Sequence, residues 1–229
     1  MTTIIVNNHS TLVSDGEVAK VVEHLQKQVK HHFAPVWGIT ADIWFWDNSK
    51  SIPADYWQLA VFDTSDVANA LGYHDLTSTG MPLGKVFVKT TVDNKMAWSV
   101  TMSHELLEML VDPYINLAAF VPYSSTTGRL VAYEVGDPVE DDSLGYACGS
   151  VLLSDFVYPN YFVPGASGPY DYCGHVTSPL QILPTGYYAY LDVGKTHGWQ
   201  FANGKSVKEG TRHQVRTKVP DKENSKNSK

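Results

Sequence analysis

The sequence predicts an α+β protein in which a mixed, twisted sheet with an edge strand lies over a long helix and a β-rich C-terminal part follows. In the first half of the chain, short β-branched and aromatic stretches alternate with two helical patterns, which is typical of strands and helices packed in layers. In the second half, short strand patterns are separated by turns rich in Gly, Pro and Ser. The order of these patterns along the chain carries the prediction.

The composition fits a globular body with a basic end. Of the 229 residues, 43% are hydrophobic and 18% are charged, which is ordinary for a protein with a core. No repeat or linker interrupts residues 1–204, which we interpret as one domain. Residues 205–229 carry eight Lys and Arg against three Asp and Glu, with few apolar anchors, and predict a disordered tail. Such a tail suits an acidic partner, although a solvated terminus is the simpler interpretation, and the acidic body disfavours nucleic acid.

The N-terminal elements are the most clearly marked. Residues 2–6 are short and β-branched, as in a first strand. Ser14 and Glu17 then form a capping box, with a serine at the N-cap and a glutamate three residues later. The helix that follows is predicted to run to Pro35, because apolar residues recur at helical spacing: Val18, Val21, Val22, Leu25, Val29 and Phe33.

Several stretches lead to the second helix. Two strands and then a short helix or turn are expected at residues 39–46, 57–62 and 63–71, respectively. Residues 72–84 are polar and contain flanking glycines, so we expect a loop, in which His74 is a candidate metal ligand or substrate contact. Residues 85–91 alternate in character and are expected to form the edge strand before the helix, with lysines that protect the edge against aggregation.

The second helix carries a pattern of ligand-type side chains. It is predicted over residues 99–111 and ends at the Asp112–Pro113 pair, because proline disfavours helical geometry in the residue before it. His104 and Glu108 are four residues apart and share a face, so both can bind one metal ion. Glu105 lies about 100° around the helix, where it can reach a water held by that ion. The alternative is that all three belong to a solvated helix face.

A third ligand is expected from a later segment. Zinc accepts imidazole and carboxylate ligands, and catalytic zinc sites use three protein ligands and a water. If residues 130–137 are helical, Glu134 and Asp137 share a face. Glu134 would then complete the zinc site, and Asp137 would accept the spare ring N–H of His104 and fix its orientation. The alternative for Glu134 is a solvent-facing carboxylate on a strand.

The remaining C-terminal segments are short. A hairpin turning near Gly149 is predicted over residues 146–157, a long loop over 164–186 and a last strand over 187–193. The stretch 137–142 has four carboxylates in six residues, which suits calcium, but it lacks the spacing and the glycine of an EF-hand loop. Candidates for stabilising an oxyanion or contacting a substrate, besides His74, are Tyr158, Tyr161 and His175.

Four motifs together carry a family resemblance: Gly72-Tyr-His-Asp, Met81-Pro-Leu-Gly-Lys-Val-Phe, Ser103-His-Glu-Leu-Leu-Glu-Met-Leu-Val-Asp-Pro and Glu134-Val-Gly-Asp-Pro-Val. Over about residues 1–200 the chain resembles a group of poorly characterised bacterial and bacteriophage proteins with a zincin-like, gluzincin-type metallopeptidase fold. It departs from the His-Glu-x-x-His pattern by having Glu108 in place of the second histidine. The resemblance implies a metallopeptidase-type fold, with an extended peptide lying along the edge strand.

Two functional hypotheses follow. The leading one is a zinc-dependent hydrolase for a peptide or protein substrate, with His104, Glu108 and Glu134 as metal ligands and Glu105 as the general base. The alternative is a non-catalytic zincin-fold structural or binding protein, such as a bacteriophage virion component. The chain shows no signal-peptide pattern and no apolar run of membrane-spanning length, so we expect a cytoplasmic or virion-associated protein without membrane contact. The only two cysteines, Cys148 and Cys173, are not spaced as a metal-binding pair but can form one disulfide.

Overall fold

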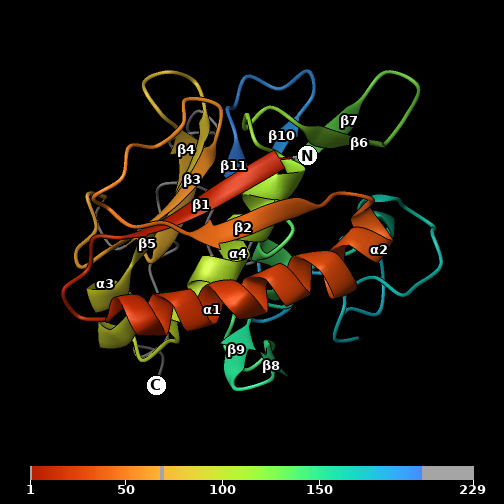
Figure 1. The fold of residues 1–229 in the computed structure, drawn as a ribbon. Coiled ribbons are helices and arrows are strands. Elements are labelled where there is room, and N and C mark those ends of the chain that lie inside the picture. Colours follow the sequence, from red (N-terminus) through yellow and green to blue (C-terminus); the bar gives the residue numbers. More distant parts are fainter. Residues whose placement is uncertain (1, 68–69, 203–229) are drawn as a thin grey trace, which may run out of the picture.

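The structure, a computed structural model, describes residues 2–67 and 70–202 and confirms a mixed α+β protein with several sheets (Figure 1). The first elements are β1 Thr2–Asn8, α1 Asp15–Lys27, the π-helix η1 Gln28–Phe33, α2 Ala34–Trp37, β2 Ala41–Phe45, β3 Trp57–Phe62, β4 Gly72–Leu76, β5 Pro82–Phe87, α3 Val88–Asp93 and α4 Trp98–Val111. They are followed by β6 Ala118–Pro122, β7 Gly128–Ala132, the 3₁₀ turn η2 Asp137–Val139, β8 Tyr146–Cys148, β9 Val151–Leu153, the 3₁₀ turn η3 Pro159–Phe162, β10 Ala189–Asp192 and β11 Gln200–Phe201. The tail predicted over residues 205–229 lies outside the described residues.

The largest sheet contains five strands in the order β2-β1-β3-β5-β4. The first four of these are parallel, and β4 pairs antiparallel with β5. β4 is therefore an edge strand. The predicted loop over residues 72–84 is wrong for residues 72–76, which form β4, and for residues 82–84, which belong to β5. The prediction that residues 85–91 form the edge is also wrong, because β5 lies between β3 and β4 and residue 88 begins α3. The polar residues of β4 gave no strand signal, since the strand is specified by its pairing with β5.

α1 and α4 pack on the same face of this sheet. Ile4 of β1 shares one buried cluster with Leu25 of α1 and Leu106 of α4. Successive residues of a strand point to opposite faces. On the other face, Tyr73 and Phe87 belong to a separate, smaller cluster. The long helix α4 is thus enclosed between the sheet and the C-terminal segments.

The capping box at the start of α1 is confirmed, with both reciprocal hydrogen bonds between Ser14 and Glu17. The helix does not end at Pro35 as predicted. It continues through η1 into α2. Pro35 lies in the first turn of α2, where the backbone N–H that proline lacks is not required. It ends at Gly38, whose φ of 68° is the left-handed conformation that favours glycine at a helix end.

The helix predicted over residues 130–137 is wrong, because its first three residues belong to a second sheet and a 3₁₀ turn begins only at residue 137. This second sheet has four antiparallel strands in the order β11-β10-β7-β6, and residues 130–132 belong to β7. The helix is predicted only from the spacing of Glu134 and Asp137. The backbone pairing of β7 with β6 and β10 outweighs that spacing. The predicted hairpin at Gly149, which has a φ of 61°, is confirmed as β8 and β9, but its second strand ends at Leu153 and not at residue 157.

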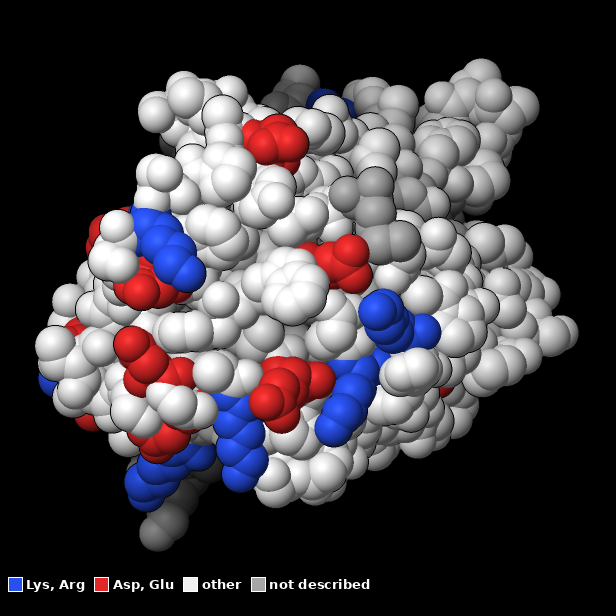
Figure 2. All heavy atoms as spheres, viewed as in Figure 1, with Lys and Arg blue, Asp and Glu red and all other residues white. Residues whose placement is uncertain are grey.

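The surface carries both signs of charge. In Figure 2, acidic and basic side chains are interspersed over the part of this face that covers α1, so they form no continuous basic area there. None of the described helices has the length and apolar character to cross a membrane. Cys148 and Cys173 are both free thiols, so the disulfide considered from the sequence is not formed.

Candidate metal centre

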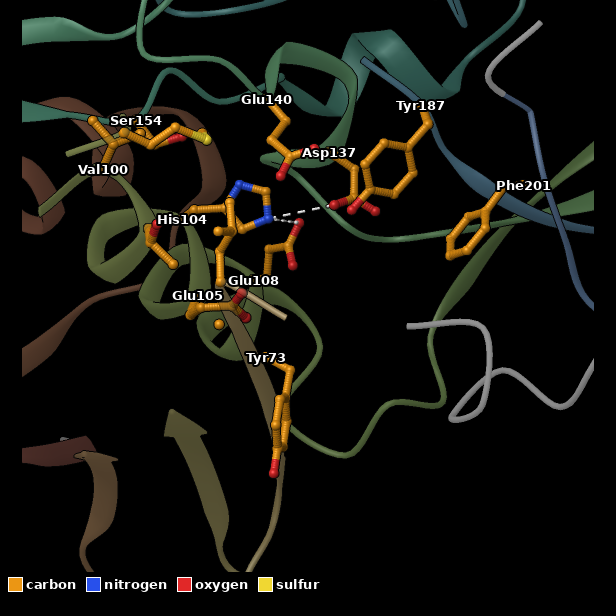
Figure 3. Close-up of a pocket in the computed structure, with 14 residues that line it drawn as sticks. Tyr73, Val100, His104, Glu105, Glu108, Asp137, Glu140, Ser154, Tyr187 and Phe201 are labelled. Atoms are coloured by element: carbon orange, nitrogen blue, oxygen red, sulfur yellow. Dashed lines mark ion pairs between the residues drawn. The ribbon is translucent and has the colours of Figure 1, made fainter. Parts of the chain in front are cut away.

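α4 brings the His104 and Glu108 side chains together inside the protein. Every residue from Ser99 to Val111 is buried, so the solvated-face alternative for this helix is wrong. The Nε2 atom of His104 lies 3.3 Å from Oε1 of Glu108, as expected for residues four apart on a helix (Figure 3). Glu105, the next residue after His104, also faces the cavity in this view. The helix alone therefore supplies two ligand-type groups and a neighbouring carboxylate.

Asp137, from η2, meets the same ring nitrogen of His104. Its Oδ1 atom is 3.3 Å from Nε2, which is the nitrogen that also faces Glu108 (Figure 3). The predicted contact between Asp137 and the other ring nitrogen is therefore wrong. Nδ1 instead faces the backbone, because a Cβ atom at Gly136 would lie 2.4 Å from it. Ligand atoms of His104, Glu108 and Asp137 all lie within 4.8 Å of one another, so the three can hold one ion.

Glu134 is buried, but it lies with a different histidine from the one predicted. Its ligand atom and those of His74 and Glu108 are within 4.8 Å of one another. His74 comes from β4, and its Nδ1 atom is 3.9 Å from Glu108 Oε2 and 3.7 Å from Glu105 Oε2. Its Nε2 atom donates to the backbone carbonyl of the residue after α4, at 3.3 Å. Glu108 thus belongs both to the His104 group and to the His74 group. Because Glu134 is buried, its alternative interpretation as a solvent-facing carboxylate on a strand is also wrong.

Tyr187 is a site residue that the sequence did not single out. Its hydroxyl donates to the carboxylate of Asp137, and its backbone N–H donates to the Asp137 carbonyl at 3.0 Å. Tyr158 and Tyr161, the predicted candidates, are not among the described residues that line the cavity. The Tyr161 hydroxyl donates to the Gln181 carbonyl in the core, and Tyr158 packs on an aromatic ring. Nothing local in the sequence could separate one tyrosine of thirteen from the others.

The cavity beside these groups has a volume of about 40 Å³. That volume holds an ion with roughly two or three waters. Its lining residues are Leu71, Gly72, Tyr73, Met96, Val100, Thr101, His104, Glu105, Glu108, Asp137, Glu140, Ser154, Tyr187 and Phe201. Within the described part of the chain, no Lys or Arg side chain belongs to this lining.

The acidic stretch 137–142 does not converge on one point. Asp137 faces His104, and Glu140 lines the same cavity. Asp141 instead accepts the Ser143 N–H at 2.8 Å. Asp142 accepts the Ala97 N–H at 2.6 Å, just before α4 begins. The carboxylates therefore do not all face one point, and the stretch does not form a calcium-binding loop.

The electrostatics of the site favour a bound cation. Burial and the nearby Glu108 carboxylate raise the pKa of Asp137 to about 6. The pKa of His104 is raised well above its usual value, because the Glu108 and Asp137 carboxylates outweigh the effect of burial. Glu105, Glu108, Glu134 and Asp137 are each at most 6% exposed. Burying several carboxylates is costly unless a positive charge or a proton accompanies them, so the donor set fits a divalent metal ion.

Comparisons of the chain with known protein families, with curated protein sequences and with solved structures give no match. The interpretation of the site therefore rests on the positions and chemistry of its own side chains.

Proposed function

We propose that the protein is a zinc-dependent hydrolase that acts on a peptide-like bond. The observation that carries this proposal is the position of His104 Nε2, 3.3 Å from a carboxylate oxygen of both Glu108 and Asp137, beside a cavity that Glu105 also lines. One imidazole and two carboxylates leave a fourth position of a tetrahedral zinc site for water. Asp137 takes the ligand position that the sequence suggested for Glu134.

Each neighbouring side chain then has a defined task. A bound Zn²⁺ supplies a Lewis acid and lowers the pKa of water. Glu105 accepts a proton from the attacking water and returns it to the leaving amine. Tyr187 orients Asp137 through its hydroxyl. The Nδ1 atom of His74 lies 3.7 Å from Glu105 Oε2 and so helps to position the general base.

The edge strand β4 supports a peptide as the substrate class. It has a neighbour on one side in the five-stranded sheet, and Gly72 and Tyr73 line the same cavity. An extended peptide can add to such an edge through backbone hydrogen bonds. The parallel sheet with an antiparallel edge strand, and two helices on one face, also supports the zincin-like resemblance.

The size of the cavity favours a second candidate, a non-catalytic structural or binding protein in which the ion stabilises the fold. A volume of about 40 Å³ is suited to an ion and a few waters. In that case the metal would hold α4 to the segment after β7. A virion component is one form that such a protein would take.

Glu105→Gln separates the two candidates, because this substitution removes the base and keeps the size of the side chain. For an enzyme, we expect Glu105→Gln to retain the ion at His104 and to lower hydrolysis of a fluorogenic peptide library by roughly 10²–10⁴-fold. His104→Ala should lose the activity and the ion at this site. Glu23→Gln, at an exposed position of α1, is the matched control and should match the wild type.

The measurements are metal content of the purified protein and peptide hydrolysis. A wild-type protein that binds zinc at His104 but cleaves no peptide, together with a lowered melting temperature for His104→Ala, would favour the structural candidate. A metal content of His104→Ala equal to that of the wild type would reject the site itself.

A further inference from the structure

A second group of ligand-type side chains lies away from the cavity. Ligand atoms of Asp155, Cys173 and His175 are all within 4.8 Å of one another. Asp155 follows β9, whereas Cys173 and His175 come from a turn in the long loop that precedes β10. The three residues are therefore brought together by the fold, and none of them lines the cavity at His104.

Asp155 has a buried oxygen that lacks a donor. The residue is 0% exposed, and its Oδ1 atom accepts the backbone N–H groups of Phe156 at 2.7 Å and Cys173 at 3.1 Å. Its Oδ2 atom has no hydrogen-bond donor among the residues that the structure describes. Beside it lies another carboxylate, that of Asp171, which repels the charge of Asp155 and can share a proton with it when no cation is bound. A buried carboxylate oxygen without a donor is costly, and a cation at this point would remove the cost.

His175 is held with one ring nitrogen satisfied. Asp171 accepts its backbone N–H at 2.7 Å and so fixes the turn that carries it. The Nε2 atom of His175 lies 3.2 Å from the Leu144 carbonyl oxygen, which can only accept a hydrogen bond. Nε2 therefore carries the proton in the neutral ring, and Nδ1 keeps a lone pair. A carbonyl that fixes the tautomer in this way is a common feature of metal-binding histidines.

We propose that Asp155, Cys173 and His175 form a second zinc site that stabilises the loop before β10, with water as the fourth ligand on the exposed side of His175. A thiolate, an imidazole and a carboxylate suit Zn²⁺, whereas Ca²⁺ and Mg²⁺ select oxygen ligands alone. On binding, the Cys173 thiol releases its proton to solvent and its sulfur forms the bond to the metal. The ion would fasten the loop before β10 to the end of β9.

The consequence reaches α4, because Ser154 precedes Asp155 and its backbone N–H donates to the Ser103 hydroxyl at 3.1 Å. Fixing Asp155 therefore also fixes a contact of the helix that carries His104. The second site does not depend on the proposed hydrolase activity.

Substitution by cobalt(II) tests this site separately from the first one. A cobalt–thiolate bond gives a charge-transfer band in the near ultraviolet. No cysteine is among the described residues that line the cavity at His104. Reduced, metal-free protein titrated with Co²⁺ should develop the band, and Cys173→Ser should abolish it. Cys148→Ser removes the other cysteine of the chain and is the matched control, which should keep the band. His104→Ala should also keep it, whatever the activity of the protein.

His175→Ala provides a second variant at an exposed position, in case Cys173→Ser does not fold. We expect it to weaken Co²⁺ binding, measured through the same band, by at least about tenfold. The proposal is overturned if the wild type shows no band, which would mean that Asp155 and Asp171 share a proton instead. It is equally overturned if Cys148→Ser loses the band or if His175→Ala binds Co²⁺ unchanged.

Discussion

At the scale of single residues, Gly136 sets how closely the backbone approaches His104. A Cβ atom at this position would lie 2.4 Å from Nδ1 and 2.7 Å from Cε1 of the ring. These distances are far below van der Waals contact, so any side chain here must displace the imidazole. The ring would then move away from Glu108 and Asp137.

We therefore predict that Gly136→Ala lowers zinc affinity by roughly tenfold or more, because displaced ligands bind a metal less well. Competition with a chromophoric chelator would measure the affinity. Gly16→Ala is the control, since a Cβ there would meet nothing closer than 4.0 Å. Equal zinc affinity of Gly136→Ala and the wild type would contradict the role given to this glycine.

Asp63 is a residue whose charge stabilises the fold outside the candidate site. It accepts hydrogen bonds from the Ser10 and Thr11 hydroxyls and from backbone N–H groups of Thr11 and Leu12. These bonds, with the Ser10 and Thr11 side chains as the largest cause, lower the pKa of Asp63 to about 2. In the unfolded chain its pKa is about 3.9.

Because the folded pKa of Asp63 is the lower one, the stability it contributes is present above about pH 4 and is lost as the pH falls toward 2. We expect Asp63→Asn to unfold with a weaker pH dependence than the wild type between about pH 4 and 2. Urea unfolding at a series of pH values tests this. Parallel curves for the two proteins would show that the carboxylate does not contribute in this way.

At the scale of elements, a buried network of hydrogen bonds holds η1, α4 and β9 in register. The Ser103 hydroxyl donates to Gln28 Oε1 at 2.9 Å and accepts the Ser154 N–H at 3.1 Å. Gln28 Nε2 donates to the Ser154 carbonyl at 3.0 Å. The three residues are at most 2% exposed, so water cannot replace a lost partner. The network places α4, and with it His104, relative to the C-terminal half.

Ser103→Ala should lower the free energy of unfolding by about 1–3 kcal/mol, because it leaves buried polar groups of Gln28 and Ser154 without a partner. Chemical denaturation measures the change. The exposed Ser78, substituted in the same way, should show a change within about 0.5 kcal/mol. A Ser103→Ala protein as stable as Ser78→Ala would mean that the network adds little.

At the scale of the whole molecule, the candidate metal centre lies where the two halves of the fold meet. His104 and Glu108 come from the helix under the five-stranded sheet, and Asp137 follows a strand of the four-stranded sheet. A metal ion bound by all three would connect these parts directly. It would also offset the buried carboxylates that otherwise repel one another.

Removal of the metal should therefore lower the melting temperature, and added Zn²⁺ should restore it. At a free zinc concentration about 100 times the dissociation constant, binding stabilises the folded state by about 3 kcal/mol. Thermal melting with and without a chelator measures this effect. The comparison belongs in a Cys173→Ser background, where the second proposed site does not contribute. A melting temperature unaffected by the chelator in that protein would contradict a metal at His104.

Those features of the fold and of the candidate site whose residues are close along the chain could be predicted from the sequence. The two residues of the α1 capping box are three positions apart, and His104 and Glu108 are one helical turn apart, so local geometry determines both. The turn at Gly149 is likewise local. For such features, the backbone conformation alone fixes which side chains meet.

The tertiary structure alone decided which later residue meets His104, because that choice depends on pairing between distant strands. β7 formed where a helix was expected, and as a result Asp137 faces His104 while Glu134 lies with His74. The edge position of β4 and the contact of Tyr187 with Asp137 have the same origin. Their hydrogen-bond partners lie far away in the sequence, and no spacing or propensity within a short window encodes them.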